Sequence, residues 1–355
     1  MPKRHGVGTS KTQLVAHVEE IVLATSGEDA FEVVFAIAAA RITEDPKRPL
    51  RTAIAAARKR HRTLDLAPLD DAPDDLLARV DALLKESLGR DFEALDAVFE
   101  SLVPRLAKGD KGQFFTPRHV VDFVIRALVP KKNDVVIDPA CGSGAFLAHA
   151  RAAGVKNTHG SDVDARAVRV ARLLTLASGG DPRTIVRADG LREELPVADI
   201  VATNPPFAGR APADGFEVKD LVRTPERDVL FLERALDLLR PGGRLGIVLP
   251  YNKASGAAFA NLRRWLVDRA RVLAVVGLPR ETFLPHTSQR TFVLFAKKRA
   301  RRETPKSSEP TLLVVSERAG KDTAGDPIFK GDTLDHDLDD ALAELRPFFT
   351  KERFA

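Results

Sequence analysis

Residues 204–207 read Asn-Pro-Pro-Phe, and their side chains suit the handling of an NH₂ group that is conjugated to an aromatic ring or a carbonyl. The lone pair of such a nitrogen is delocalised, so the nitrogen is a poor nucleophile until two acceptors hold its hydrogens. The Asn204 side-chain oxygen and the Pro205 carbonyl can supply that pair, while Pro206 adds no competing N–H donor. Phe207 offers a flat face for stacking. A plain Pro-Pro turn after a buried strand explains the same four residues.

A second group of candidate binding residues lies upstream. Residues 134–138 predict a short buried strand, and residues 139–147 predict a tight turn that enters a helix. Gly142 and Gly144 would let a ligand approach the backbone of this turn. The spacing differs from the three-glycine dinucleotide loop, and the Lys-Ser/Thr ending of a phosphate loop is missing. A nucleotide phosphate is therefore not the expected ligand of this turn, and a turn without any ligand explains the same residues.

The next predicted strand ends in acidic residues. Asp162 lies 24 residues after Asp138, close to where doubly wound folds place a carboxylate that receives a ribose. Asp164 is expected to cap the helix predicted over residues 165–174. Asp162 is therefore the better candidate for the ribose.

Two more predicted strands, over residues 184–187 and 199–203, end in Asp189-Gly190 and in the Asn204 motif. Asp189 fits either an ordinary Asp-Gly turn or a carboxylate that binds an adenine NH₂ group. In an open α/β sheet, ligands lie outside the carboxyl ends of the strands. We therefore expect these turns to line one crevice that holds a cofactor beside a substrate.

In combination, these segments resemble S-adenosylmethionine-dependent adenine-N6 DNA methyltransferases of the class whose cofactor motifs precede the catalytic one. The resemblance is closest to the modification subunits of type I restriction-modification systems, and it covers roughly residues 90–300. Residues 113–117 read Gln-Phe-Phe-Thr-Pro, and this segment matters most for the choice of family, because few methyltransferases carry it upstream of the glycine-rich turn. The matching segments, in family order, are residues 111–117, residues 138–147, Asp162 with Asp189, and residues 204–207.

The resemblance implies S-adenosyl-L-methionine as the cofactor. Thr116 would help hold the methionine carboxylate, and Asp138 with the glycine-rich turn would hold the methionine end. Asp162 would bind the ribose hydroxyls and Asp189 the cofactor adenine. The implied cofactor-binding residues are Phe115, Thr116, Pro117, Asp138, Pro139, Ala140, Gly142, Ser143, Gly144, Phe146, Asp162, Val163, Asp189, Gly190 and Asn204.

The resemblance also implies direct methyl transfer to the amino nitrogen, without a covalent enzyme intermediate. The implied catalytic residues, which clamp the target base, are Asn204, Pro205, Pro206 and Phe207. Phe283 lies in a segment that resembles the family's late loop, where it would pack on the base or serve as an ordinary core side chain. The base must leave the duplex, at a cost of about a few kcal/mol. Cys141, the single cysteine, is expected to be a packed residue and not a nucleophile.

The expected fold is α/β, with the Rossmann-like seven-stranded sheet of class I methyltransferases and a smaller, all-helical N-terminal domain. The downstream pattern predicts helices over residues 228–239 and 257–269 and strands over 244–250, 272–276 and 291–296. We predict three parts: residues 1–105 as the helical domain, 106–300 as the catalytic domain, and 301–355 as a linker and tail. The first part is predicted to contain helices over 76–84 and 92–102, and the last a strand over 311–316 and a helix over 338–345.

Composition and charge indicate which kinds of partner and compartment to expect. The net charge of +5 suits a polyanion, and the basic clusters at residues 58–62 and 297–302 are either solvated faces or phosphate contacts. One cysteine, no leader and no long apolar run predict a cytoplasmic protein that does not span a membrane. The eight histidines do not cluster, so no metal site is expected.

The sequence after residue 300 leaves no room for a target-recognition domain. We therefore expect double-stranded DNA as the substrate, a separate DNA-specificity subunit as a partner, and a nuclease subunit as a further candidate partner. One alternative is a protein glutamine N5-methyltransferase, whose Asn-Pro-Pro motif normally ends in tyrosine. Another is a non-catalytic scaffold that binds S-adenosylmethionine or DNA, and an RNA substrate also stays open.

Overall fold

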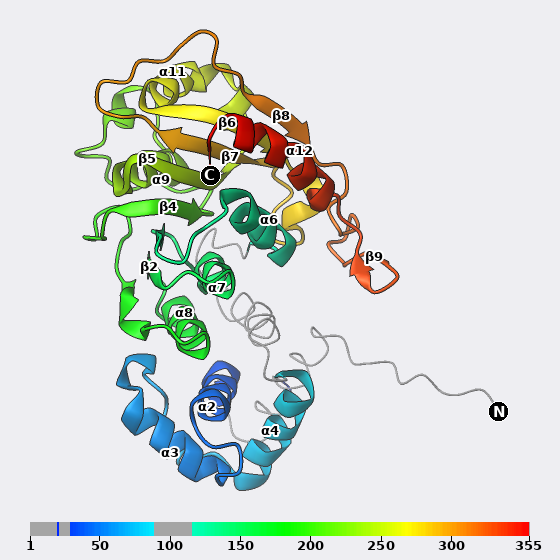
Figure 1. Cartoon of the computed structure of the whole chain (residues 1–355). Coiled ribbons are helices and arrows are strands. Elements are labelled where there is room, and N and C mark those ends of the chain that lie inside the picture. The colour runs from blue at the N-terminus through cyan, green and yellow to red at the C-terminus, as the bar shows by residue number, and fades with distance from the viewer. Residues whose placement is uncertain (1–19, 21–28, 89–115, 355) are drawn as a thin grey trace, which may run out of the picture. The chain divides into compact units, whose positions relative to one another are not determined.

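The computed structural model describes residue 20, residues 29–88 and residues 116–354 (Figure 1). It forms two compact units, one from residues 1–109 with 169–183 and the other from residues 110–168 with 184–355. Phe115 and the helix predicted over residues 92–102 lie outside the described residues.

The first unit is helical in its described part. Its elements are α2 (Ala30–Thr43), α3 (Leu50–Arg60), the 3₁₀ turn η1 (Arg62–Leu64), α4 (Asp74–Leu88) and the later part of α8 (Ala165–Ala177). Asp29 caps α2 by accepting a hydrogen bond from the backbone N–H of Phe31 at 2.9 Å. The Arg41 guanidinium joins α2 to α4 through two bonds of 2.7 Å to the Asp81 carboxylate. The helix predicted over residues 76–84 is confirmed as part of α4.

The second unit contains an eight-stranded sheet with strand order β3-β2-β1-β4-β5-β7-β6-β8. Strands β1 to β5 pair in parallel, β7 runs antiparallel between β5 and β6, and β8 pairs in parallel with β6. The strands are β1 (Val135–Asp138), β2 (Asn157–Asp162), β3 (Ile185–Arg187), β4 (Ala198–Thr203), β5 (Leu239–Pro250), β6 (Ala270–Gly277), β7 (Thr291–Lys298) and β8 (Leu312–Val315).

Helices cover both faces of this sheet (Figure 1). The α-helices that begin in this unit are α6 (Arg118–Leu128), α7 (Ala145–Ala152), α8, α9 (Arg227–Leu238), α10 (Asn252–Ser255), α11 (Ala260–Arg269) and α12 (Leu338–Lys351). The short elements are η2 (Pro182–Thr184), η3 (Glu217–Asp220), η4 (Ala257–Phe259), η5 (Arg280–Phe283) and the two-stranded hairpin of β9 (Phe329–Lys330) and β10 (Thr333–Leu334).

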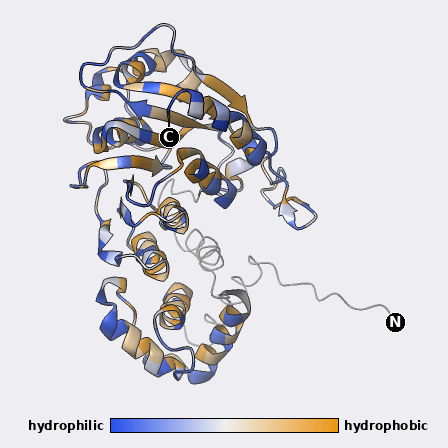
Figure 2. Cartoon of the chain, viewed as in Figure 1, coloured by the Kyte–Doolittle hydropathy of each residue, from blue (hydrophilic) through white to orange (hydrophobic). Residues whose placement is uncertain are grey.

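Alternation along the central strands explains the two layers. Phe295 of β7 contacts Phe123 of α6 and Phe349 of α12, with ring centroids 5.8 and 5.5 Å away. Its neighbours Leu294 and Ala296 point to the opposite face, into the core shared with α9 and α11. Each buried leucine or phenylalanine side chain stabilises this packing by about 1.5–3 kcal/mol. Figure 2 shows hydrophobic residues gathered on the strands, as expected for a sheet covered on both faces.

The predicted α/β fold class is confirmed, but the predicted number of seven strands is wrong. The tail strand, predicted over residues 311–316, joins the same sheet as β8, with Ala274 opposite Leu312 and Gly277 opposite Val315. Without β8, the outer edge of β6 would present unpaired N–H and C=O groups. The boundaries at residues 105 and 300 stay a prediction. Among the described residues, no helix is long and apolar enough to cross a membrane.

Candidate active site

The carboxyl ends of β1, β2 and β4 come together at one edge of the sheet. The backbone N–H of Cys141 donates to the Ser161 carbonyl at 3.0 Å, which joins the turn after β1 to β2. The Thr203 hydroxyl, at the end of β4, donates to the Asp138 carboxylate at 2.6 Å. The structure therefore brings the glycine-rich turn, the acidic strand ends and the Asn204 motif into one region, as predicted for an open α/β sheet.

Asp162 holds the glycine-rich turn in place. Its Oδ2 accepts the N–H of Gly142 at 2.9 Å, and its Oδ1 accepts the N–H of Asp164 at 2.9 Å. Gly142 and Gly144 have φ angles of 51° and 87°, a region that disfavours residues with a Cβ. Burial raises the pKa of the Asp162 carboxyl. Its proposed role at the ribose stays a prediction.

Asp164 caps α8, because its Oδ1 accepts the backbone N–H of Ala167 at 2.7 Å. This confirms the capping role predicted from the sequence. It also separates the functions of the two neighbouring carboxylates, since Asp162 contacts the glycine-rich turn and Asp164 the helix start.

Asp138 is almost fully buried at the end of β1. Burial raises the pKa of its carboxyl to about 7, even though hydrogen bonds from the Thr203 hydroxyl and the Ala140 N–H favour the ionised form. Thr203 was not among the site residues predicted from the sequence. The available signal was its place at the end of β4, because β4 pairs with β1 and a polar side chain there can reach Asp138.

Asp138→Asn is expected to change the pH dependence of stability. The folded protein binds the Asp138 proton up to pH about 7, whereas the unfolded chain releases it near pH 4, so this carboxyl lowers the free energy of unfolding as the pH rises between those values. An asparagine keeps an acceptor for Thr203 and does not ionise. The variant should therefore gain about 2–4 kcal/mol relative to wild type between pH 5 and pH 8. Urea unfolding at both pH values measures this, with the exposed Asp332→Asn as the control.

Gly190 packs directly against the turn that follows β1. A Cβ at this position would lie 1.7 Å from the Pro139 carbonyl oxygen and 2.7 Å from Ser161 Oγ. The exposed Asp189 carboxylate accepts the N–H of Leu191 at 3.1 Å, which forms an Asp-Gly turn. Formation of the turn does not exclude a contact with a cofactor adenine, and that role of Asp189 stays a prediction.

Asn204 has one satisfied end and one unsatisfied end. Its Nδ2 donates to the Thr116 hydroxyl at 2.9 Å. Its Oδ1 is buried and has no hydrogen-bond partner in the part of the chain that the structure describes. Leaving a buried acceptor unpaired costs about 1–3 kcal/mol, so this oxygen is the strongest sign that a ligand donor belongs here.

The two aromatic candidates meet. The rings of Phe207 and Phe283 pack edge to face, with centroids 5.6 Å apart and planes at 80°. The sequence suggested both residues separately, and the structure brings them together from the turn after β4 and from η5. Both are nearly fully buried, so a base that stacks on Phe207 must displace part of this contact. Their roles on a base stay predictions.

The other predicted cofactor residues differ in solvent exposure. Pro117, Pro139, Ser143 and Phe146 are buried, and Val163 is exposed. The Cys141 side chain is also buried and packs beside Gly160, where a Cβ would lie 3.0 Å from the Cys141 Cβ. This agrees with the packing role predicted for the cysteine. Within the described ranges, no group of three or more potential metal ligands occurs.

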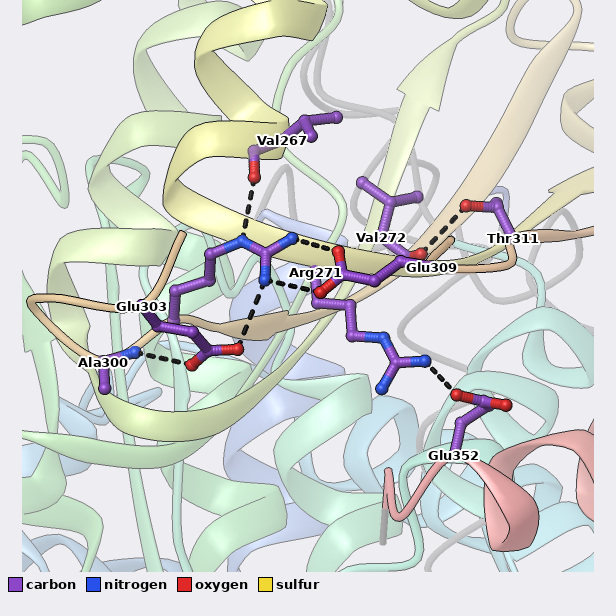
Figure 3. A network of polar contacts seen from close by, with 9 residues as sticks. Val267, Arg271, Val272, Ala300, Glu303, Glu309, Thr311 and Glu352 are labelled. Atoms are coloured by element: carbon purple, nitrogen blue, oxygen red, sulfur yellow. Dashed lines mark hydrogen bonds and ion pairs between the residues drawn. The ribbon is translucent and has the colours of Figure 1, made fainter. Parts of the chain in front are cut away.

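One predicted basic cluster is occupied by structural contacts. Arg299 is 5% exposed and donates to the Val267 carbonyl at 3.0 Å and to the Glu309 carboxylate at 2.9 Å. Figure 3 shows its partners Val267 and Glu309 within a network of polar contacts. Lys298 donates to the Leu239 carbonyl at 2.6 Å. Lys298 is the last residue of β7, and Arg299 follows it. Because β7 runs antiparallel to β5, both residues lie at the opposite end of the strands from Asn204. The cluster at residues 58–62 includes exposed basic side chains at the end of α3, and its role stays open.

Arg299→Ala is therefore expected to destabilise the fold and to leave DNA contacts unchanged. Removing the guanidinium leaves the Glu309 carboxylate and the Val267 carbonyl without their hydrogen-bond donor. The free energy of unfolding should therefore fall by about 2–3 kcal/mol. Arg301→Ala is the matched control, because Arg301 is exposed and should change stability by less than about 0.5 kcal/mol. Chemical denaturation measures both variants. Equal stability of the two would contradict the structural role of Arg299.

The fold is similar to that of proteins described as class I S-adenosylmethionine-dependent methyltransferases. A Listeria monocytogenes protein described as a member of that class superposes with a TM-score of 0.66 at 17% identity, over 96% of this chain and 98% of that one. The methyltransferase subunit of a type I restriction-modification system from Streptococcus thermophilus gives a TM-score of 0.66 at 17% identity, over 96% and 93% of the two chains. At this identity, the likeness shows the fold.

Residues 90–326 match the model of the N-6 DNA Methylase family, and the chain belongs to this family. The methylase subunit of the Escherichia coli type I restriction enzyme EcoEI is 30% identical over 225 residues, which are 57% of this chain and 46% of that protein. The chain spans about half the length of the curated relatives that it matches.

Proposed function

We propose that this protein transfers a methyl group from S-adenosyl-L-methionine to the N6 amino group of adenine in double-stranded DNA. Its biological role would be that of a modification subunit in a restriction-modification or related defence system. Membership of the N-6 DNA Methylase family and likeness to type I methylase subunits support this proposal. The observation that carries it is the buried Oδ1 of Asn204, directly after β4, which has no hydrogen-bond partner among the described residues.

The adenine amino group matches that acceptor. It carries two hydrogens, and Asn204 Oδ1 can take one while the Pro205 carbonyl takes the other. Holding both hydrogens draws the nitrogen lone pair out of conjugation with the ring, and the nitrogen becomes a better nucleophile. Phe207 would stack on the base after it leaves the duplex, which offsets part of the cost of unstacking.

The chain's residues also fit the cofactor. The positive φ angles of Gly142 and Gly144 allow close approach to the backbone, and Asp138 places a carboxylate at the end of β1. Asp162 would hold the ribose hydroxyls and Asp189 the adenine ring. S-adenosyl-L-methionine supplies an electrophilic methyl group on its sulfonium when bound. The ionised form of Asp138 would stabilise a positive charge nearby, and its pKa of about 7 makes that form available near neutral pH.

We further propose that a separate DNA-specificity subunit directs the reaction to particular sequences, with a nuclease subunit as a further partner. The predicted helical domain over residues 1–105 or the tail over residues 301–355 is the proposed docking segment for the specificity subunit. Because the substrate is cellular DNA, we place the protein in the cytoplasm. A tight, sequence-specific DNA complex formed by the purified chain alone would contradict the need for this partner.

The test is transfer of labelled methyl from S-adenosyl-L-methionine to DNA, by the chain alone and with a co-expressed specificity subunit, followed by nucleoside analysis. Label in N6-methyladenine supports the proposal, and DNA already saturated with that mark should accept none. Label in protein glutamine would favour the glutamine methyltransferase alternative, and label in RNA would change the substrate. If the cofactor binds and no acceptor is labelled under either condition, the chain is a scaffold.

A further inference from the structure

We propose that the Thr116 hydroxyl couples cofactor binding to the orientation of the Asn204 carboxamide. This inference rests on the proposed function, because the orientation matters only if Asn204 Oδ1 receives the amino group of a substrate. Thr116 would then be a positioning residue, which acts on the reaction through Asn204 and not on the base itself. The carrying observation is the bond of 2.9 Å from Asn204 Nδ2 to Thr116 Oγ1.

The direction of that bond decides which end of the amide faces the substrate. With Nδ2 turned to Thr116, Oδ1 is left as a buried acceptor without a partner among the described residues. A rotation of the amide by half a turn would present NH₂ to the amino group of the base, and two donors cannot bond to each other. The orientation in the structure is therefore the productive one.

Thr116 alone does not enforce this orientation. A threonine hydroxyl accepts or donates, so it could bond either end of the Asn204 amide. In the part of the chain that the structure describes, the Thr116 hydroxyl accepts a hydrogen bond from Asn204 and bonds no other group. Its own proton is therefore free to bond an anionic group.

An anionic ligand group bound to the Thr116 hydroxyl would fix the orientation of the Asn204 amide. If the hydroxyl proton goes to a carboxylate, such as that of the methionine moiety, the hydroxyl can only accept from Asn204. Nδ2 must then face Thr116 and Oδ1 must face the substrate. Occupancy of the cofactor site and alignment of the acceptor thus become one event, and the acceptor is aligned only when a methyl donor is present.

The first arm of the test is a double-mutant cycle on DNA methylation. Thr116→Val removes the hydroxyl and should lower kcat about tenfold, whereas Thr116→Ser should stay within about threefold of wild type. In the Asn204→Ala background, Thr116→Val should have no further effect on kcat, because the hydroxyl acts through Asn204. Thr158→Val is the matched control, since Thr158 is a buried threonine whose hydroxyl has no partner among the described residues. Equal losses in both backgrounds would overturn the proposal.

The second arm does not need methylation. The chain has five asparagines, so selective ¹⁵N labelling should resolve the side-chain amide of Asn204. Saturation with S-adenosylhomocysteine, which keeps the methionine carboxylate, should slow hydrogen exchange of the Asn204 amide at least about tenfold in wild type and not in Thr116→Val. Unchanged exchange despite bound ligand would overturn the coupling even if DNA is methylated. Slowed exchange without DNA methylation, measured with the specificity subunit present, would support the coupling and reject the proposed substrate.

Discussion

Asn204→Ala is expected to lower the rate of methyl transfer to DNA by about 10²–10³-fold, comparable to the loss of one preorganised polar group from other active sites. The alanine removes the buried Oδ1, which has no partner among the described residues. The amino group of the base would then keep its lone pair in conjugation. The affinity for S-adenosylhomocysteine should change by less than about tenfold, because most proposed cofactor contacts lie on other strand ends.

Single-turnover kinetics with calorimetric measurement of cofactor binding separates these two effects. Asn261→Ala is the matched control, because Asn261 is exposed on α11 and should keep the wild-type rate. A variant that loses cofactor affinity as strongly as rate would show that Asn204 serves the cofactor. A variant with the wild-type rate would remove the main support for an amino-group acceptor.

The local parts of the site could be predicted from the sequence. The glycine-rich turn, the cap at Asp164 and the Asp-Gly turn at Asp189 depend on residues that are close together along the chain. Turn and cap preferences arise from backbone conformation and from hydrogen bonds within a few residues. Such signals survive in a single sequence because no distant segment is needed to interpret them.

The contacts between distant segments could not be predicted. Phe207 and Phe283 were separate candidates, and only the fold shows that their rings meet. Thr116 was assigned to the cofactor by resemblance, whereas the structure gives it a bond to Asn204. Side-chain pairs of this kind depend on strand order and on loop conformation, and the spacing of residues along the chain predicts neither.

Charge was the least informative sequence signal. Lys253 is 3% exposed, and its ammonium lies 2.5 Å from the Glu226 carboxylate and 3.0 Å from that of Asp228. Burial raises the pKa of Asp228 to about 6, although Lys253 opposes that shift. Nothing in the sequence separates these residues from solvated ones. Arg299 is a second example, because it belongs to a basic run that fits DNA phosphates, yet its side chain bonds Val267 and Glu309 within the fold.

The turn after β3 is not expected to tolerate an added methyl group at Gly190. At Gly190, an added Cβ would lie 1.7 Å from the backbone oxygen of Pro139, far inside contact distance. Backbone atoms cannot move aside as a flexible side chain can, so Gly190→Ala must displace either this turn or the turn after β1. Asp189 would move with it, away from its proposed position at the cofactor adenine.

We therefore expect Gly190→Ala to weaken S-adenosylhomocysteine binding by at least about tenfold and to lower the free energy of unfolding by about 1–3 kcal/mol, the usual range for overpacking. Gly277→Ala is the matched control, because a Cβ there would meet its nearest neighbour at 3.8 Å, an ordinary contact. Calorimetric titration and urea unfolding of both variants measure the two effects. Wild-type affinity in a destabilised Gly190→Ala protein would show that this turn supports the fold and does not shape the cofactor site. Loss of affinity at nearly unchanged stability would instead place the turn in direct contact with the cofactor.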